Sequence, residues 1–108
     1  MAFSINQIQI GMRDTVLWVR SLGFNTTDSG DGVTNVEAGM EGAMDIPHVF
    51  MPIASDGMAY GEADRLWEAV CEKGLGDHPD VDIQLSYSPK DGVSTLGLFG
   101  INDDLLNA

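Results

Sequence analysis

The chain has 108 residues, of which 44% are hydrophobic and 20% charged, and its 17 Asp and Glu against five Lys and Arg give a net charge of -12. This length and composition predict one globular domain over residues 1–108 and argue against disorder. The negative charge disfavours direct binding to nucleic acids or anionic membranes, and favours cationic ligands, metal ions or proteins with a basic surface.

Several features bear on the cellular compartment. The single cysteine, Cys71, excludes an intrachain disulfide, which suits a reducing environment. The N-terminus lacks the basic and apolar regions of a signal peptide, and no segment approaches the roughly 20 apolar residues of a membrane helix. We therefore expect a cytoplasmic protein.

The first predicted helix covers Arg13–Leu22 and ends at Gly23, because glycine commonly follows the last helical turn. Its apolar face consists of Met12, Val16 and Val19. Trp18 lies off this face, and we expect it to be an exposed anchor for a partner. Residues 3–10 fit either an extension of this helix or a short strand.

A short strand is predicted over Phe24–Thr27, leading into the stretch "DSGDG" at residues 28–32. Asp-Gly is a strong hairpin signal, so the pattern favours a turn at this point. The alternative is a loop that directs the carboxylates of Asp28 and Asp31 at a cation. Residues 33–45 are weakly patterned, and Pro47–Ile53 is predicted to be a strand.

A second helix is predicted over Met58–Lys73. Its apolar stripe consists of Ala59, Ala63, Leu66, Trp67, Val70 and Cys71, and places Trp67 and Cys71 in the core. Its solvent side carries Glu62, Asp64, Glu68 and Glu72. We expect these four acidic residues and Trp18 to form the partner-binding surface.

Residues 81–101 have the pattern of a hairpin, because apolar and polar residues alternate over 81–87, "SPKDG" has the composition of a turn, and Val93–Ile101 can return as a strand. The tail at residues 102–108 is expected to fray. The order helix, strand, strand, helix, strand, strand predicts an α+β two-layer sandwich, with two helices on a mostly antiparallel sheet of four to five strands. This order is a circular shift of the ferredoxin-like plan.

One metal site is conceivable. If the strand beginning at His48 pairs beside the strand that enters "DSGDG", then Asp28, Asp31, Asp45 and His48 converge on one divalent ion such as Mg, Mn or Zn. The alternative is a structural histidine, since the chain has only two histidines and lacks the Cys and His spacing of structural zinc sites.

Two family resemblances accompany these patterns. "INQIQIG" with a helix ending in "SLGF", and "PHVFMPI" with an acidic helix and a hairpin, resemble vicinal oxygen chelate proteins. That resemblance implies metal ligands at Gln7 and His48, although the closing strand "STLGLFGI" lacks a ligating Glu. The chain also resembles small RNA-cleaving toxins, but Ser29-Gly30-Asp31 stands where their turn carries Gly-Ser-His, and its charge opposes RNA binding.

The residues form no complete catalytic set. The leading hypothesis is a small acidic, non-enzymatic interaction module that binds a basic protein surface, for example a viral or mobile-element inhibitor of a nucleic-acid-handling protein. The first alternative is a metal-dependent enzyme or small-ligand binder that uses the carboxylate and histidine site. The second is a structural subunit of a homo-oligomer. No cofactor is expected apart from the divalent metal of the first alternative.

Overall fold

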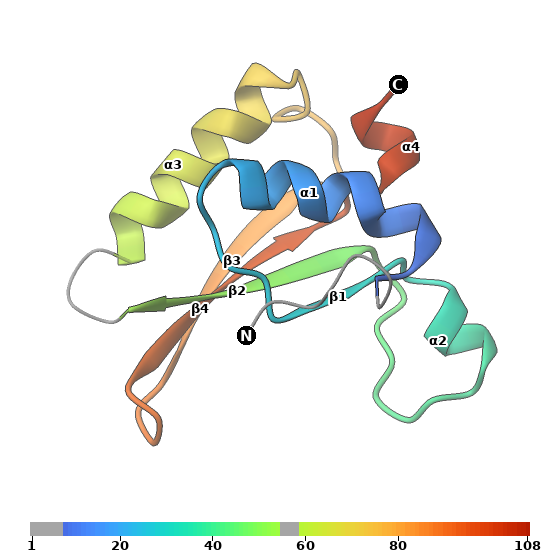
Figure 1. The fold of residues 1–108 in the computed structure, drawn as a ribbon, viewed down its shortest axis with the longest axis horizontal. Helices are drawn as coiled ribbons and strands as arrows, with labels where there is room; N and C mark the ends of the chain where they lie inside the picture. The colour runs from blue at the N-terminus through green and yellow to red at the C-terminus, as the bar shows by residue number, and fades with distance from the viewer. Residues whose placement is uncertain (1–7, 55–58) are drawn as a thin grey trace.

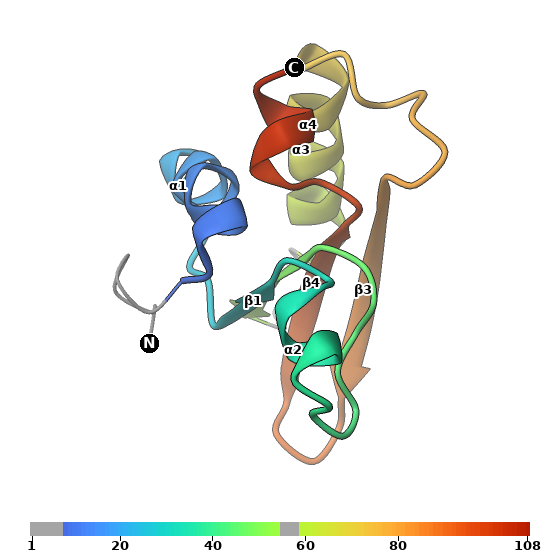
Figure 2. The same ribbon diagram turned by 90° about the vertical axis from the view of Figure 1, so that its right-hand side faces the viewer.

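The computed structural model describes residues 8–54 and 59–108. A four-stranded sheet with the order β1-β2-β4-β3 forms one layer, and every neighbouring pair of strands is antiparallel. The strands are β1 (Asp28–Gly30), β2 (His48–Ala54), β3 (Asp82–Ser88) and β4 (Val93–Phe99). Helices α1 (Arg13–Ser21) and α3 (Ala59–Glu72) lie over one face of this sheet (Figure 1 and Figure 2). The predicted α+β architecture is therefore confirmed.

The chain order also agrees with the prediction once three short helical segments are added. These are η2 (Ile10–Met12), α2 (Thr34–Glu37) and α4 (Asp103–Leu106). Strands β2 and β3 are parallel to each other because both pair antiparallel with β4, which lies between them. The unit β2–α3–β3 is thus a split βαβ unit of the kind found in ferredoxin-like folds. The relation to that fold stays a prediction.

The core lies between the helices and one face of the sheet. Alternate side chains of a strand point to opposite faces, so β2 and β4 both direct apolar residues toward α1 and α3. The most deeply buried members are Met12, Val16, Val19, Val49, Met51, Leu66, Val70, Leu96, Leu98 and Ile101. The apolar face predicted for α1 is confirmed. The stripe predicted for α3 is wrong at its margin, because Trp67 is 37% exposed and Cys71 is exposed.

The stretch "DSGDG" is not a hairpin turn, which corrects the sequence-based prediction. Asp28–Gly30 is itself strand β1, paired with residues 50–48 of β2. The ring of His48 lies against Gly30, where an added Cβ would be 2.6 Å from the His48 Cε1 atom. Only glycine leaves room for that contact. The Asp-Gly pair that follows, with Gly32 at a φ of 80°, leads into α2.

The C-terminal tail is ordered, contrary to the expectation that it frays. Asn102 caps α4, since its side-chain Oδ1 accepts a hydrogen bond of 2.9 Å from the amide of Leu105. Asp103 binds the N-terminal end of α1. Leu105 and Leu106 pack against the core. Local sequence does not reveal this docking because its partners lie at the other end of the chain.

The remaining predictions concern the hairpin, the N-terminal segment and membrane-spanning helices. The hairpin at residues 81–101 is confirmed by the β3–β4 pair. The ambiguous segment 3–10 falls mostly outside the described residues. Within the described part of the chain, no helix has the length and hydrophobicity needed to cross a membrane.

Candidate functional site

The structure brings together two of the four predicted metal ligands. Because β1 pairs with β2, Asp28 and His48 line one cavity of about 210 Å³, together with Glu41 and Met44 of the preceding loop. His48 is 7% exposed, and its Nδ1 atom lies 3.0 Å from the carbonyl oxygen of Ile46. The histidine also has a structural role, since its ring contacts Gly30 and lies 5.3 Å from that of Phe50.

Asp31 does not line this cavity and instead caps the start of helix α2. Its carboxylate accepts hydrogen bonds from the amide of Val33 at 2.9 Å and from the amide and hydroxyl of Thr34 at 2.8 and 2.5 Å. Burial opposes ionisation of Asp31, but these hydrogen bonds outweigh it and hold the pKa of the carboxyl below its ordinary 3.8. The carboxylate of Asp31 is therefore engaged in local structure.

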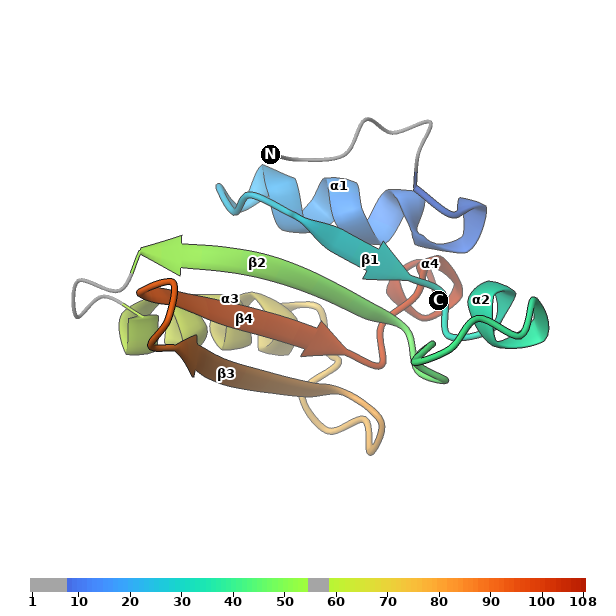
Figure 3. The ribbon, with the colours of Figure 1, turned by 90° about the horizontal axis from the view of Figure 1, so that it is seen from below.

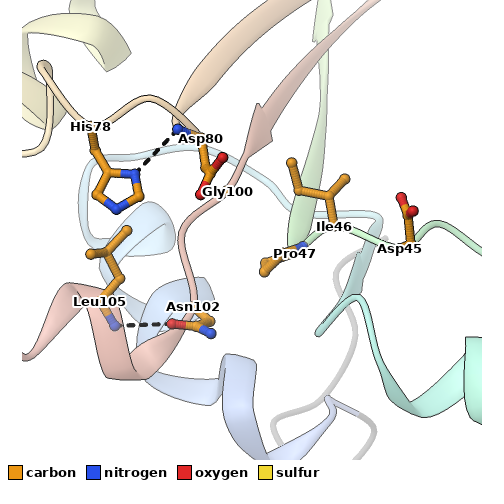
Figure 4. Close-up of a pocket in the computed structure, with 8 residues that line it drawn as sticks. All are labelled: Asp45, Ile46, Pro47, His78, Asp80, Gly100, Asn102 and Leu105. Carbon is orange, nitrogen blue, oxygen red and sulfur yellow. Dashed lines mark hydrogen bonds between the residues drawn. The ribbon is translucent and has the colours of Figure 1, made fainter.

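Asp45 lies in a different place, at a cavity of about 500 Å³ shown in Figure 4. Asp45 stands on one side of this cavity, while His78 and Asp80 stand on the other. The Nδ1 atom of His78 accepts a hydrogen bond from the amide of Asp80 at 3.2 Å, and Asn102 is occupied in capping α4. Imidazole and carboxylates at one cavity suit a small cationic ligand better than an anion.

The four predicted ligands thus do not form one site. Across residues 8–54 and 59–108, no group of three or more His, Cys, Asp or Glu side chains is arranged to hold a metal ion. Gln7, which the vicinal oxygen chelate resemblance implies as a ligand, lies outside the described residues.

The predicted partner-binding residues lie on two different sides of α3. On the side facing α1, Glu62 forms a salt bridge of 2.6 Å with Arg65. Arg65 also donates to the carbonyl of Leu22, and its guanidinium lies 4.1 Å from the centre of the Phe24 ring. Glu62 is therefore compensated by a neighbouring cation.

Trp18 lies in α1 and is near the side of α3 that faces α1. It is half-buried and packs against the core, and the Lys73 amine lies 5.9 Å from its ring centre. Trp18 is therefore partly covered by its own chain, and a role in partner binding stays a prediction.

The opposite side of α3 faces strand β3. Residues 60, 64, 67 and 71 share this side because three- and four-residue steps return to the same helix face. A small cavity of about 260 Å³ lies here, lined by Ala63, Asp64, Trp67, Asp82 and Ile83. Two tyrosines are also open to solvent, Tyr60 at 78% and Tyr87 at 59%.

We call this region the α3–β3 surface. It consists of Tyr60, Asp64, Trp67, Cys71, Asp82, Ile83, Leu85 and Tyr87. The exposed residues Glu68 and Glu72 lie on the solvent side of the same helix.

Comparison with models of protein families, curated protein sequences and solved structures found no match to this chain. The function of the protein is therefore inferred from the residues of its cavities and of the α3–β3 surface.

Sequence reasoning missed the aromatic members of this surface. At about 100° per residue, Trp67 and Cys71 lie at the margin of the stripe that Leu66 and Val70 define. Periodicity gives the direction of a stripe, but its width depends on how far β3 extends beneath the helix. Tyr87 belongs to the alternating pattern of β3, but this pattern does not indicate that a residue near the end of the strand is exposed, and Tyr60 lies in the first turn of α3 outside its apolar stripe.

Proposed function

We propose that this protein is a small acidic interaction module without catalytic activity, and that its α3–β3 surface binds a basic surface of a protein partner. A concrete form is an inhibitor that acts in the cytoplasm on a nucleic-acid-handling protein, of the kind that viruses and mobile elements encode. Such a partner offers the basic surface that the charge of -12 favours, while that charge opposes direct nucleic-acid and membrane binding.

The observation that carries the proposal is the separation of charge around α3. Both basic residues of this segment, Arg65 and Lys73, contact α1 or the loop that follows it. Asp64 lies on the opposite side, at the cavity beside β3, and Glu68 and Glu72 are exposed between the two sides. The surface away from α1 therefore presents negative charge beside apolar rings.

This combination is typical of a protein interface. Exposed charges act over about 8 Å at physiological ionic strength, so they accelerate association and select basic partners. The aromatic side chains, Trp67 above all, supply apolar contact area that salt does not weaken. The complex should therefore weaken with salt without being abolished by it.

A fluorescence anisotropy titration with a labelled lysine-rich peptide tests the proposal. The triple variant Asp64→Asn, Glu68→Gln, Glu72→Gln removes charge from the proposed surface. The matched control Glu37→Gln, Glu41→Gln, Asp104→Asn removes the same charge from exposed positions elsewhere. We expect at least about tenfold weaker binding for the first variant and at most about threefold for the control. Equal losses would mean that only net charge matters, and no binding by the wild type would end the proposal.

A small-ligand or metal-binding function is the second candidate, favoured by the cavity that Asp28 and His48 share. It predicts that Mn²⁺ or Zn²⁺ raises the melting temperature of the wild type but not of His48→Ala. Two ligands are few for either ion, so we expect no shift. A rise that depends on His48 would favour this candidate over the interaction module.

A further inference from the structure

We propose that the basic partner binds as an extended strand along the free edge of β3, with alternate side chains lying in the α3–β3 surface. This inference rests on the proposed function and adds a mode of recognition and a partner chemistry, namely a peptide segment in which apolar and basic residues alternate. Strand addition of this kind takes affinity from main-chain hydrogen bonds and specificity from pockets for alternate side chains.

The first argument is the state of the sheet edge. Strand β3 ends the order β1-β2-β4-β3 and, among the strands of residues 8–54 and 59–108, pairs with β4 alone (Figure 3). Alternate residues of an antiparallel edge strand direct their N–H and C=O groups away from the sheet. At seven residues β3 is long enough for several such bonds, whereas the opposite edge, β1, has three residues.

The second argument is that β3 lacks the features that normally protect an edge. Exposed edge strands usually carry Lys, Pro, a bulge or inward-pointing charges, which prevent pairing with other chains. The sequence DIQLSYS of β3 contains neither Lys nor Pro, and its one charged residue, Asp82, is the first of the strand. Its register with β4 runs without a bulge from Asp82 to Ser88.

The third argument is the asymmetry of the two faces beside this edge. Ile83, Leu85 and Tyr87 share the face that is directed toward α3, since they pair with Leu98, Leu96 and Ser94 of β4. Ile83 and Leu85 are half-buried, and Tyr87 is largely exposed. The other face carries the exposed polar side chains of Asp82, Gln84 and Ser86. An added strand would therefore place apolar side chains on one face and polar ones on the other.

Charge complementarity identifies the partner strand as basic. Asp82 shares the face of Gln84, because its Oδ2 atom lies 3.4 Å from the Gln84 Nε2 atom, and this is the face on which the basic side chains of an added strand would lie. A Lys or Arg side chain of the added strand would meet the carboxylate of Asp82 on that face, while the carboxylate of Asp64, at the cavity beside Trp67, adds attraction that acts over about 8 Å. The carboxylate of Glu68 is exposed on the next turn of the helix.

A second copy of this chain is the competing occupant. Antiparallel pairing of two β3 strands about Leu85 would place Ile83 opposite Tyr87, which is a favourable apolar pair. The same pairing would bring together two chains that each carry a net charge of -12, and would bring their Asp64 and Glu68 side chains close. Like charges at an interface oppose association, so the basic peptide is favoured.

The experiment uses an end-capped seven-residue peptide of alternating valine and lysine. Two analogues carry N-methyl groups on the valines or on the lysines, so that each loses the amide donors of one strand edge and keeps its charge. Strand addition predicts that one analogue binds at least about tenfold more weakly while the other retains its affinity. Hydrogen exchange should show at least about tenfold added protection at alternate amides of β3.

A matched pair of variants accompanies the peptides. Tyr87→Lys places a charge at the free edge, and Val93→Lys places the same charge on β4, where Val93 is 37% exposed. We expect about tenfold weaker binding for Tyr87→Lys and a change within about twofold for Val93→Lys.

The outcomes separate this inference from the proposed function. If the three peptides bind equally and β3 gains no protection, strand addition is overturned while the acidic interaction module stands. If no peptide binds at low salt, the proposed function itself fails. If β3 is protected without peptide and light scattering gives twice the chain mass, a second copy occupies the edge and the inference is overturned.

Discussion

The contact between the chain's two ends gives a quantitative test of the fold. The carboxylate of Asp103 accepts hydrogen bonds from the amide of Thr15 at 2.7 Å, from the Thr15 hydroxyl at 2.8 Å and from the amide of Asp14 at 3.2 Å. The first amides of a helix have no partner within the helix. Asp103 therefore acts as an N-cap for α1, although it lies 88 residues from Thr15.

Substitution of Asp103 by alanine removes this cap. Loss of an N-cap costs about 1 kcal/mol, and the fully buried Thr15 hydroxyl is left without this acceptor, which adds about 1 to 2 kcal/mol. We expect the free energy of unfolding to fall by about 2 to 3 kcal/mol in total, and the melting temperature to fall by about 10 °C for a chain of this size. Asp103→Asn should lose less, because its amide oxygen still accepts a hydrogen bond.

Urea denaturation followed by tryptophan fluorescence measures this change. Asp104→Ala is the matched control, since Asp104 is the exposed neighbour in the same turn of α4, and its free energy of unfolding should change by about 0.5 kcal/mol or less. Equal stability of the two variants would refute the reasoning and would mean that the tail frays in solution.

Three further experiments test the exposure of Cys71, the space around two glycines and the capping role of Asp31. Cys71 is exposed, so Ellman's reagent should modify the native protein completely within minutes. Reaction only after denaturation would show that this thiol is buried in the core. Gly97→Ala should destabilise the protein by about 1 to 3 kcal/mol, because the new Cβ would lie 2.7 Å from the Phe99 ring. Gly61→Ala, whose new Cβ would meet no atom of the described residues within 4 Å, should stabilise α3 by about 0.5 to 1 kcal/mol. Urea denaturation that gives both changes the same sign would contradict this reasoning. The lowered pKa of Asp31 means that its contribution is present above the unfolded value of 3.8 and disappears as the pH falls through the lower folded value. The stability difference between the wild type and Asp31→Ala should therefore shrink below about pH 4, and a difference independent of pH would contradict the capping role.

Local patterns predicted the elements whose evidence is itself local. The β3–β4 hairpin follows from the alternating pattern of β3 and the turn composition of the residues after it, and helices α1 and α3 follow from apolar periodicity. "DSGDG" was misread because its turn chemistry competes with a non-local event. Pairing with β2 and the contact between His48 and Gly30 keep Asp28–Gly30 extended.

The pairing of β1 with β2 explains which residues of the candidate metal site lie together in the structure. Asp28 and His48 line the same cavity because β1 and β2 are neighbouring strands. Asp31 is lost to this site because β1 ends at Gly30 and the next residue caps α2. Asp45 is lost because its segment turns toward Gly100, whose amide donates to the carbonyl of Pro47 at 2.8 Å. Neither the capping role of Asp31 nor the course of the segment around Asp45 is indicated by the hydrophobic periodicity of the sequence.

The most direct test of the central claim is a map of amide chemical shifts recorded while the alternating valine and lysine peptide is added. We predict that the large changes are confined to α3 and β3 and to the residues that connect them, with Trp67 and Asp82 among the most affected. Changes spread evenly over all acidic positions, or centred on the cavity of Asp28 and His48, would contradict the account.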